Sequence, residues 1–125
     1  FSQGNAGEDM IFREADASHN LRPEVVETMF YLWRITGEKR WKNYAWKMFQ
    51  AWEKHCKVPS GGYSGVRSVL QDPPALADKM ESFFLSETLK YLFLIFDDAA
   101  ADSLSFGDWV FNTEGHPLPI WRSGT

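Results

Sequence analysis

The sequence predicts an all-α fold in which helical hairpins are joined by loops and the chain ends in a short strand and turn. Two stretches with helical spacing of apolar residues follow each other closely, separated by Gly37. A third apolar stretch with helical character covers residues 78–96. Hydrophobic residues make up 44% of the chain and charged residues 24%, which is typical of a globular protein.

The first hairpin is predicted to follow a loop that covers residues 1–20. A helix begins near Pro23, because proline suits a first helical turn, and runs to about Ile35, where Gly37 ends it. A second helix follows at 38–55, and the short connection makes the two helices antiparallel. Its apolar stripe is made by Trp41, Tyr44, Ala45, Met48, Phe49 and Trp52.

A loop-rich segment is predicted between this hairpin and the third helix. Residues 59–66 indicate a glycine-rich turn or short hairpin, and Pro73-Pro74 indicates a loop. The third helix is expected to begin at Asp78, since Asp78 and Glu81 have the spacing of a capping box, and to continue to about residue 96.

The C-terminal part is expected to hold a short strand and a turn. Residues 108–112 form the strand, which leads into a turn at Thr113. The third helix ends before it in acidic residues that lack the spacing of an EF-hand loop and are interpreted as a solvated helix end, namely Asp97, Asp98 and Asp102.

Composition excludes several classes of function. The net charge of −4 argues against binding to nucleic acid, and the longest apolar run, 91–96, is too short to be a membrane segment. The single Cys56 is either a free buried thiol or the partner of a cysteine on a missing segment. Neither a phosphate-binding glycine loop nor a nucleophile elbow is present. The histidines lack zinc-ligand spacing: His19, His55 and His116.

Carboxylates on the first and third helices are candidate site residues. Glu24 and Glu27 share one stripe of an otherwise apolar helix, so they face either solvent or a polar cavity. Phe83 and Glu87 lie four residues apart on one face, a pairing that suits a sugar site. The alternative for the second pair is a core Phe and a surface Glu paired with Lys90.

The run Phe111–Pro119 offers oxygen ligands for a hard cation. Thr113 carries a hydroxyl and its own carbonyl, and Glu114 follows it directly. Oxygen ligands of this kind are what Ca²⁺ prefers. The segment is therefore a candidate calcium site.

Three segments in this order, Leu21–Glu24, Asp78–Tyr91 and Phe111–Pro119, resemble the C-terminal part of class I α-1,2-mannosidases, glycoside hydrolase family 47. The resemblance covers residues 21–121. The catalytic domain of that family is longer, so residues 1–125 are expected to be the C-terminal segment of one domain. The chain would supply the last helical hairpins of an (αα)₇ barrel and a strand and turn that carry the calcium-binding threonine.

The resemblance implies a role for each matching residue on the sugar side. Glu24 matches the catalytic base that activates water, and Arg22 and Glu27 match residues that line the same site. Phe83 matches the aromatic residue on which mannose stacks. Glu87 matches a carboxylate that contacts the sugar or the water around the metal.

The resemblance also implies a Ca²⁺ cofactor. Thr113 matches the direct ligand and Glu114 an acid that holds metal-bound water. Bound Ca²⁺ would hold sugar hydroxyls and fix a strained ring. Gly115 stands where alanine or serine is more usual in the family, which affects none of these roles.

The implied function is Ca²⁺-dependent, inverting removal of α-1,2-linked mannose from high-mannose N-glycans, within the secretory pathway (endoplasmic reticulum or Golgi lumen) or outside the cell. The catalytic acid belongs to the upstream remainder of the domain, so this chain alone is not expected to be catalytic. One alternative is a non-catalytic protein that recognises glycans in glycoprotein quality control. A helical scaffold without a site leaves the clustered motifs unexplained.

Overall fold

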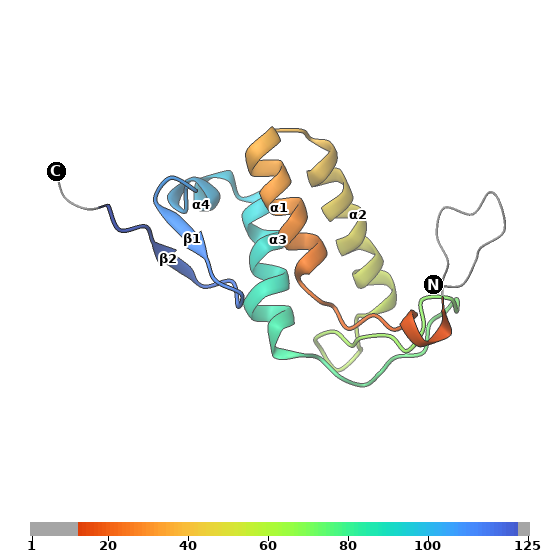
Figure 1. The fold of residues 1–125 in the computed structure, drawn as a ribbon. Helices are drawn as coiled ribbons and strands as arrows, with labels where there is room; N and C mark the ends of the chain where they lie inside the picture. Colours follow the sequence, from red (N-terminus) through yellow and green to blue (C-terminus); the bar gives the residue numbers. More distant parts are fainter. Residues whose placement is uncertain (1–12, 123–125) are drawn as a thin grey trace.

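Three helices form the main body of the molecule (Figure 1). The computed structural model describes residues 13–122. α1 (Glu24–Thr36), α2 (Arg40–His55) and α3 (Leu89–Phe96) each contact the other two. α1 and α3 run in the same direction, and α2 runs against them (Figure 1). The helical fold class is therefore confirmed for the described part of the chain.

The hairpin of α1 and α2 forms as predicted. Gly37 has φ 66°, and its N–H donates to the carbonyl of Trp33 (2.9 Å). Glycine adopts this left-handed conformation without the steric cost that a Cβ brings, so it ends α1. α2 begins two residues later than expected, at Arg40.

The third helical segment begins later than the sequence predicts. Asp78 has φ 56°, and the helical backbone starts only at Ser82. The expected capping box is wrong, because an N-cap residue needs an extended backbone and the Glu81 carboxylate pairs instead with Lys79 (2.6 Å). A π-helical segment, η2 (Phe84–Thr88), then leads into α3.

α3 ends at Phe96, and Asp98 and Asp102 are exposed, as expected for a solvated helix end. The sequence did not indicate that these residues also form a new helix, α4 (Asp98–Ser103). Asp97 is the N-cap residue of α4, and its side chain accepts a hydrogen bond from the N–H of Ala100 (2.9 Å). The other two aspartates pair with cations of the first hairpin, Lys42 with Asp98 (2.8 Å) and Arg34 with Asp102 (2.9 Å).

The C-terminal strand pairs with a second strand that the sequence did not indicate. β1 (Trp109–Phe111) confirms the expected strand, and it pairs antiparallel with β2 (Pro117–Pro119). Phe111 lies opposite Pro117. Proline is unfavourable in strands because it lacks an N–H, but an edge strand tolerates it.

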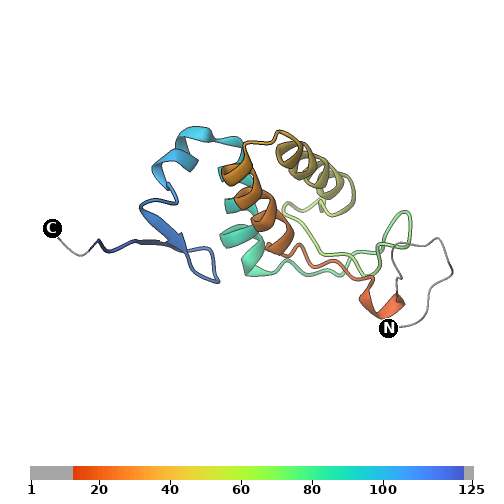
Figure 2. The same cartoon turned by 45° about the horizontal axis from the view of Figure 1, so that its top comes forward.

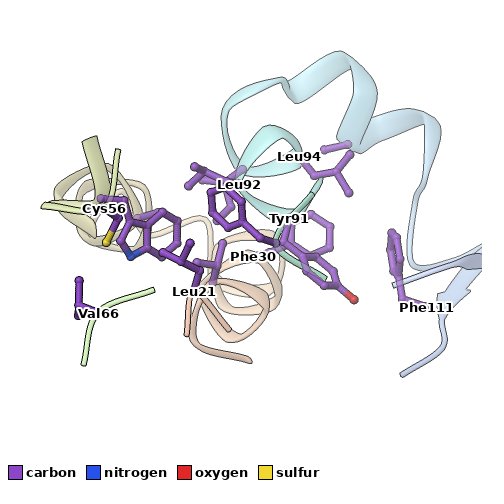
Figure 3. Close-up of a cluster of buried hydrophobic side chains, with 14 residues drawn as sticks. Leu21, Phe30, Cys56, Val66, Tyr91, Leu92, Leu94 and Phe111 are labelled. Carbon is purple, nitrogen blue, oxygen red and sulfur yellow. The ribbon is translucent and has the colours of Figure 1, made fainter. Parts of the chain in front are cut away.

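The core is one cluster of buried side chains that runs through the helical layer (Figure 3). Phe30 is fully buried, and its ring centroid lies 5.6 Å from that of Tyr91 and 5.8 Å from that of Phe111. Each such side chain stabilises the fold by about 1.5–3 kcal/mol through burial. The cluster extends from Phe111 to Cys56, which is buried and has no cysteine partner among residues 13–122.

A buried hydrogen bond ties the segment before α1 to the third helical segment. Leu21 is fully buried and has φ 58°, an uncommon conformation for a residue with a side chain. Its carbonyl accepts from the hydroxyl of Thr88, which is also fully buried (2.7 Å). Leu21 directly precedes Arg22, so this bond fixes where the first predicted site segment begins.

Loops at one end of the helices complete the fold. The expected short hairpin is confirmed by a bridge between Lys57 and Tyr63, and Val66 bridges both His19 and Leu76. Residues 13–20 are loop apart from a short 3₁₀ helix, η1 (Glu14–Asp16), while the expectation for residues 1–12 lies outside the described residues. Within residues 13–122, no helix is long and apolar enough to cross a membrane.

The outer side of α1 differs from the sequence expectation. A helix that is apolar outside one stripe is normally buried on most sides, and Val26 and Phe30 are indeed fully buried. Val25 and Ile35, however, are 52% and 71% exposed. The described chain therefore covers only one side of this helix.

The Thr88–Leu21 hydrogen bond leads to a prediction about the stability of the fold. Thr88→Val keeps the shape of the side chain but leaves the buried Leu21 carbonyl without its partner, which should lower the free energy of unfolding by about 1–3 kcal/mol. Urea unfolding of the complete protein domain, followed by circular dichroism, measures this. Thr28→Val is the matched control, because its hydroxyl bonds the Glu24 carbonyl at an exposed position. An equal loss in both variants would contradict the assignment.

Candidate active site

The three predicted segments meet at the end of the molecule where α1 and α3 begin (Figures 1 and 2). The turn between β1 and β2 reaches this end, and its Gly115 packs against the third helical segment. A Cβ placed on Gly115 would lie 3.5 Å from Cγ of Glu87 and 3.5 Å from the Tyr91 hydroxyl oxygen. That hydroxyl donates to Oε1 of Glu27 on α1 (3.2 Å). One junction thus joins both helices and the turn.

Arg22 connects the first segment to the third helical segment. Its guanidinium carbon lies 5.5 Å from the centroid of the Phe83 ring, and its Nη1 lies 3.9 Å from Oε1 of Glu24. The Glu24 side chain is 64% exposed. Both Glu24 and Glu27 lie in the first turn of α1, where the helix dipole favours a negative charge. The predicted site residues Arg22, Glu24 and Phe83 therefore lie close together.

Glu87 lies in the π-helical segment η2, directly before α3. The N–H of Leu89 donates to the carbonyl of Phe84, the wider spacing of a π turn. Such turns are rare and occur often at functional sites. Nothing in the sequence pattern indicated this departure from the α-helix, although it determines how Glu87 is presented.

Lys90 does not pair with Glu87, so the alternative based on that ion pair is wrong. Its Nζ donates instead to the backbone carbonyl of Gly115 (2.7 Å). Glu87 is left half-buried at the junction, between its own helix and the turn.

The Thr113 turn is held by Asn112. The Asn112 side-chain oxygen accepts from the N–H of Glu114 (3.0 Å) and from that of His116 (2.9 Å). The carbonyl of Asn112 accepts from the N–H of Gly115 (3.0 Å), which has φ 69°. Within residues 13–122, Thr113 takes part in none of the turn's hydrogen bonds and is exposed. Its hydroxyl and carbonyl oxygens are therefore accessible to a ligand.

Three neighbouring carboxylates act on Glu87 at this junction. Burial, and then the charges of Glu114, Glu24 and Glu27, raise the pKa of the Glu87 carboxyl. The Lys90 charge acts in the opposite direction. Because the pKa is raised, ionised Glu87 destabilises the fold at pH values above that raised pKa, and the cost disappears below the ordinary pKa of glutamate. A bound cation would offset this repulsion.

Tyr91 keeps its proton and remains a donor. Burial raises the pKa of its hydroxyl, and the nearby Glu27 charge raises it further. The hydrogen bond from Tyr91 to Glu27 is therefore present throughout the physiological pH range. It holds the Glu27 carboxylate beside the turn.

The donor atoms at the junction suit a hard cation. They are hydroxyl, carbonyl and carboxylate oxygens, the ligands that Ca²⁺ prefers. Among residues 13–122, no group of three or more His, Cys, Asp or Glu side chains is placed to hold a metal ion. The hydroxyl and carbonyl of Thr113 and the carboxylate of Glu114 are the oxygens of the turn that could serve as ligands of such a cation.

Two hollows in the described surface lie away from this junction. One, of about 340 Å³, is lined by residues that include His19, Trp52 and Cys56. The other, of about 430 Å³, lies along α2 and α3 and is lined by residues that include Trp46 and Phe93. None of the predicted site residues lines either hollow.

Sequence reasoning missed the residues that hold the site together. Asn112 and Gly115 occupy positions i and i+3 of a turn, where Asn and Gly are favoured, so their spacing was a usable signal. Lys90 and Thr88 gave no such signal, because their partners are backbone carbonyls of residues distant in sequence.

The chain is similar to known proteins along nearly its whole length. Residues 2–120 match the family described as Glycosyl hydrolase family 47. The chain is 52% identical over 115 residues to the endoplasmic reticulum mannosyl-oligosaccharide 1,2-alpha-mannosidase of Homo sapiens. It is 49% identical over 113 residues to mannosyl-oligosaccharide 1,2-alpha-mannosidase IA of Sus scrofa. Both alignments cover 90% of this chain but only 16% and 17% of the relatives.

The fold is similar to a solved structure of the same class. An alpha-1,2-mannosidase from Trichoderma reesei matches with a TM-score of 0.74 and 38% sequence identity, over 84% of this chain and 22% of that one. The chain therefore spans between 16% and 22% of the length of these proteins. From a family match over residues 2–120 and these identities, we conclude that the chain belongs to glycosyl hydrolase family 47.

Proposed function

We propose that this chain supplies part of the active site of a Ca²⁺-dependent, inverting exo-mannosidase that removes α-1,2-linked mannose from high-mannose N-glycans. The observation that carries the proposal is the junction at which Glu24, Glu27, Glu87 and Gly115 come together from three segments. The names of the relatives, mannosyl-oligosaccharide 1,2-alpha-mannosidases, support the substrate class.

Glu24 is the proposed general base. Its exposed carboxylate accepts a proton from the water that attacks the anomeric carbon, while Arg22 beside it keeps the carboxylate oriented. An inverting hydrolase needs a separate acid, far enough away to admit that water. We assign the acid to a part of the domain outside this chain, so turnover requires the complete domain.

The remaining carboxylates and Phe83 bind the sugar. A ring such as that of Phe83 covers an apolar face of mannose, and Arg22 packs on the same aromatic side chain. Glu27, held by Tyr91, and Glu87 accept hydrogen bonds from sugar hydroxyls. Their fixed positions orient the substrate relative to Glu24.

Thr113 is the proposed direct Ca²⁺ ligand, and Glu114 holds water around the metal. Bound Ca²⁺ would coordinate sugar hydroxyls. The accessible oxygens of Thr113 and the crowding of negative charge at the junction support this assignment.

Residues 1–125 form the C-terminal segment of a single (αα)₇ domain in this proposal. One side of α1 is exposed, and this exposure supports the presence of an upstream part of the domain that packs against the side chains of Val25 and Ile35. We place the complete protein in the secretory pathway or outside the cell. The endoplasmic reticulum in the name of the human relative supports this location.

Replacement of the proposed base tests the function. Glu24→Gln in the complete protein should lower kcat for mannose release by at least about a thousandfold, because the amide cannot take a proton, while glycan affinity changes little. Mannose release from an α-1,2-linked mannobiose and glycan binding by calorimetry measure the two effects. Glu38→Gln, an exposed carboxylate paired with Arg40, is the control.

The results of the mannose-release and glycan-binding measurements distinguish an enzyme from a protein that only recognises glycans. A Glu24→Gln variant with full activity would overturn the role of Glu24. Glycan binding without any mannose release by the unmodified protein would favour a non-catalytic glycan-recognition protein of glycoprotein quality control.

Replacement of the proposed ligand tests the metal site. Thr113→Ala should raise the Kd for Ca²⁺ by about tenfold or more, because one oxygen ligand is lost, whereas Thr113→Ser keeps the hydroxyl and should bind nearly as tightly. Calcium titration calorimetry of the complete protein measures both. Equal affinity in the alanine variant and the unmodified protein would remove Thr113 from the site.

A further inference from the structure

Lys90 makes a contact that its surroundings do not lead one to expect. Lys90 is half-buried, and its positive charge acts on the carboxyl of Glu87, lowering its pKa. Yet its hydrogen bond goes to an uncharged acceptor, the carbonyl of Gly115 (2.7 Å). A bond from an ammonium group to a carbonyl is stronger than one between neutral groups. The lysine therefore holds the backbone of the turn rather than neutralising one carboxylate.

The turn is rigid enough for this bond to position Thr113. Asn112 bonds both sides of the turn, through Glu114 and His116. Gly115 is buried against Glu87 and Tyr91, so the turn also rests on the helix that carries Lys90. Asn112 fixes the internal shape of the turn, and the hydrogen bond from Lys90 fixes the place of the turn on the helix.

We propose that Lys90 is a positioning residue for the calcium site, and that it holds the oxygens of Thr113 in place through the Gly115 carbonyl. The proposal rests on the proposed function, because it takes Thr113 as the direct Ca²⁺ ligand. In this role Lys90 strengthens Ca²⁺ binding. Its charge alone would weaken it, since a positive side chain repels a nearby cation.

The charge of Lys90 and its proposed positioning role predict opposite changes in the Kd for Ca²⁺, so one substitution distinguishes them. Lys90→Met keeps the length of the side chain but removes both the charge and the donor. If Lys90 acts only through its charge, its loss should tighten Ca²⁺ binding severalfold. If it positions the turn, its loss should raise the Kd for Ca²⁺ by about tenfold, the scale of one charged hydrogen bond.

Two variants serve as controls in the complete protein. Lys90→Arg keeps the charge and a donor and should recover most of the affinity. Lys79→Met removes one positive charge from an ion pair with Glu81 in the loop that bonds Ser64 and Gly65, and should leave the Kd for Ca²⁺ unchanged. Calcium titration calorimetry with CaCl₂ alone, without glycan, is the readout, and thermal unfolding in a chelator establishes that each variant is folded.

The results separate this inference from the proposed function. Weaker Ca²⁺ binding in Lys90→Met, recovered in Lys90→Arg, supports the positioning role. Unchanged or tighter binding in Lys90→Met overturns it, while loss of binding in Thr113→Ala would leave the proposed function intact. If the unmodified protein binds no Ca²⁺, the proposed function and this inference both fail.

Discussion

The placement of the half-buried Glu87 beside other carboxylates is the constraint on which the arrangement of the junction depends. Glu24, Glu27, Glu87 and Glu114 come from three segments, and the pKa of Glu87 is raised by its burial and then by the charges of the other three. The free chain would keep these charges apart, so the fold must hold them together at a cost. That cost falls on Glu87, whose ionised form is disfavoured at this junction.

Each segment is held by a hydrogen bond from the η2–α3 helix. Thr88 bonds the Leu21 carbonyl before α1, Tyr91 bonds Glu27 within α1, and Lys90 bonds the Gly115 carbonyl in the turn. Behind them, the rings of Phe30, Tyr91 and Phe111 pack in one cluster, so α1, α3 and β1 cannot shift independently (Figure 3). The side chains that line the junction thus rest on a shared rigid support.

The sequence predicted the elements with local signals and missed those determined by distant contacts. Gly37 ended α1 as expected, because a C-terminal glycine acts within a few residues. The predicted helix start at Asp78 is wrong, because the backbone there is left-handed and does not fit the capping pattern. β2 consists largely of proline, which argues against a strand. Helical spacing and ligand chemistry indicated most of the candidate site residues, and the resemblance gave them roles. The residues that hold them, Thr88 and Lys90, became visible only with the fold.

The most direct test of the whole account is the anomeric form of the released sugar. The complete protein that contains this chain should be given an α-1,2-linked mannobiose, with Ca²⁺ or with a chelator, and the product followed by NMR. The account predicts that β-mannose appears first, and only with Ca²⁺, because a water activated by Glu24 attacks the face opposite the leaving oxygen. Initial release of α-mannose, or release that the chelator leaves unchanged, would contradict it.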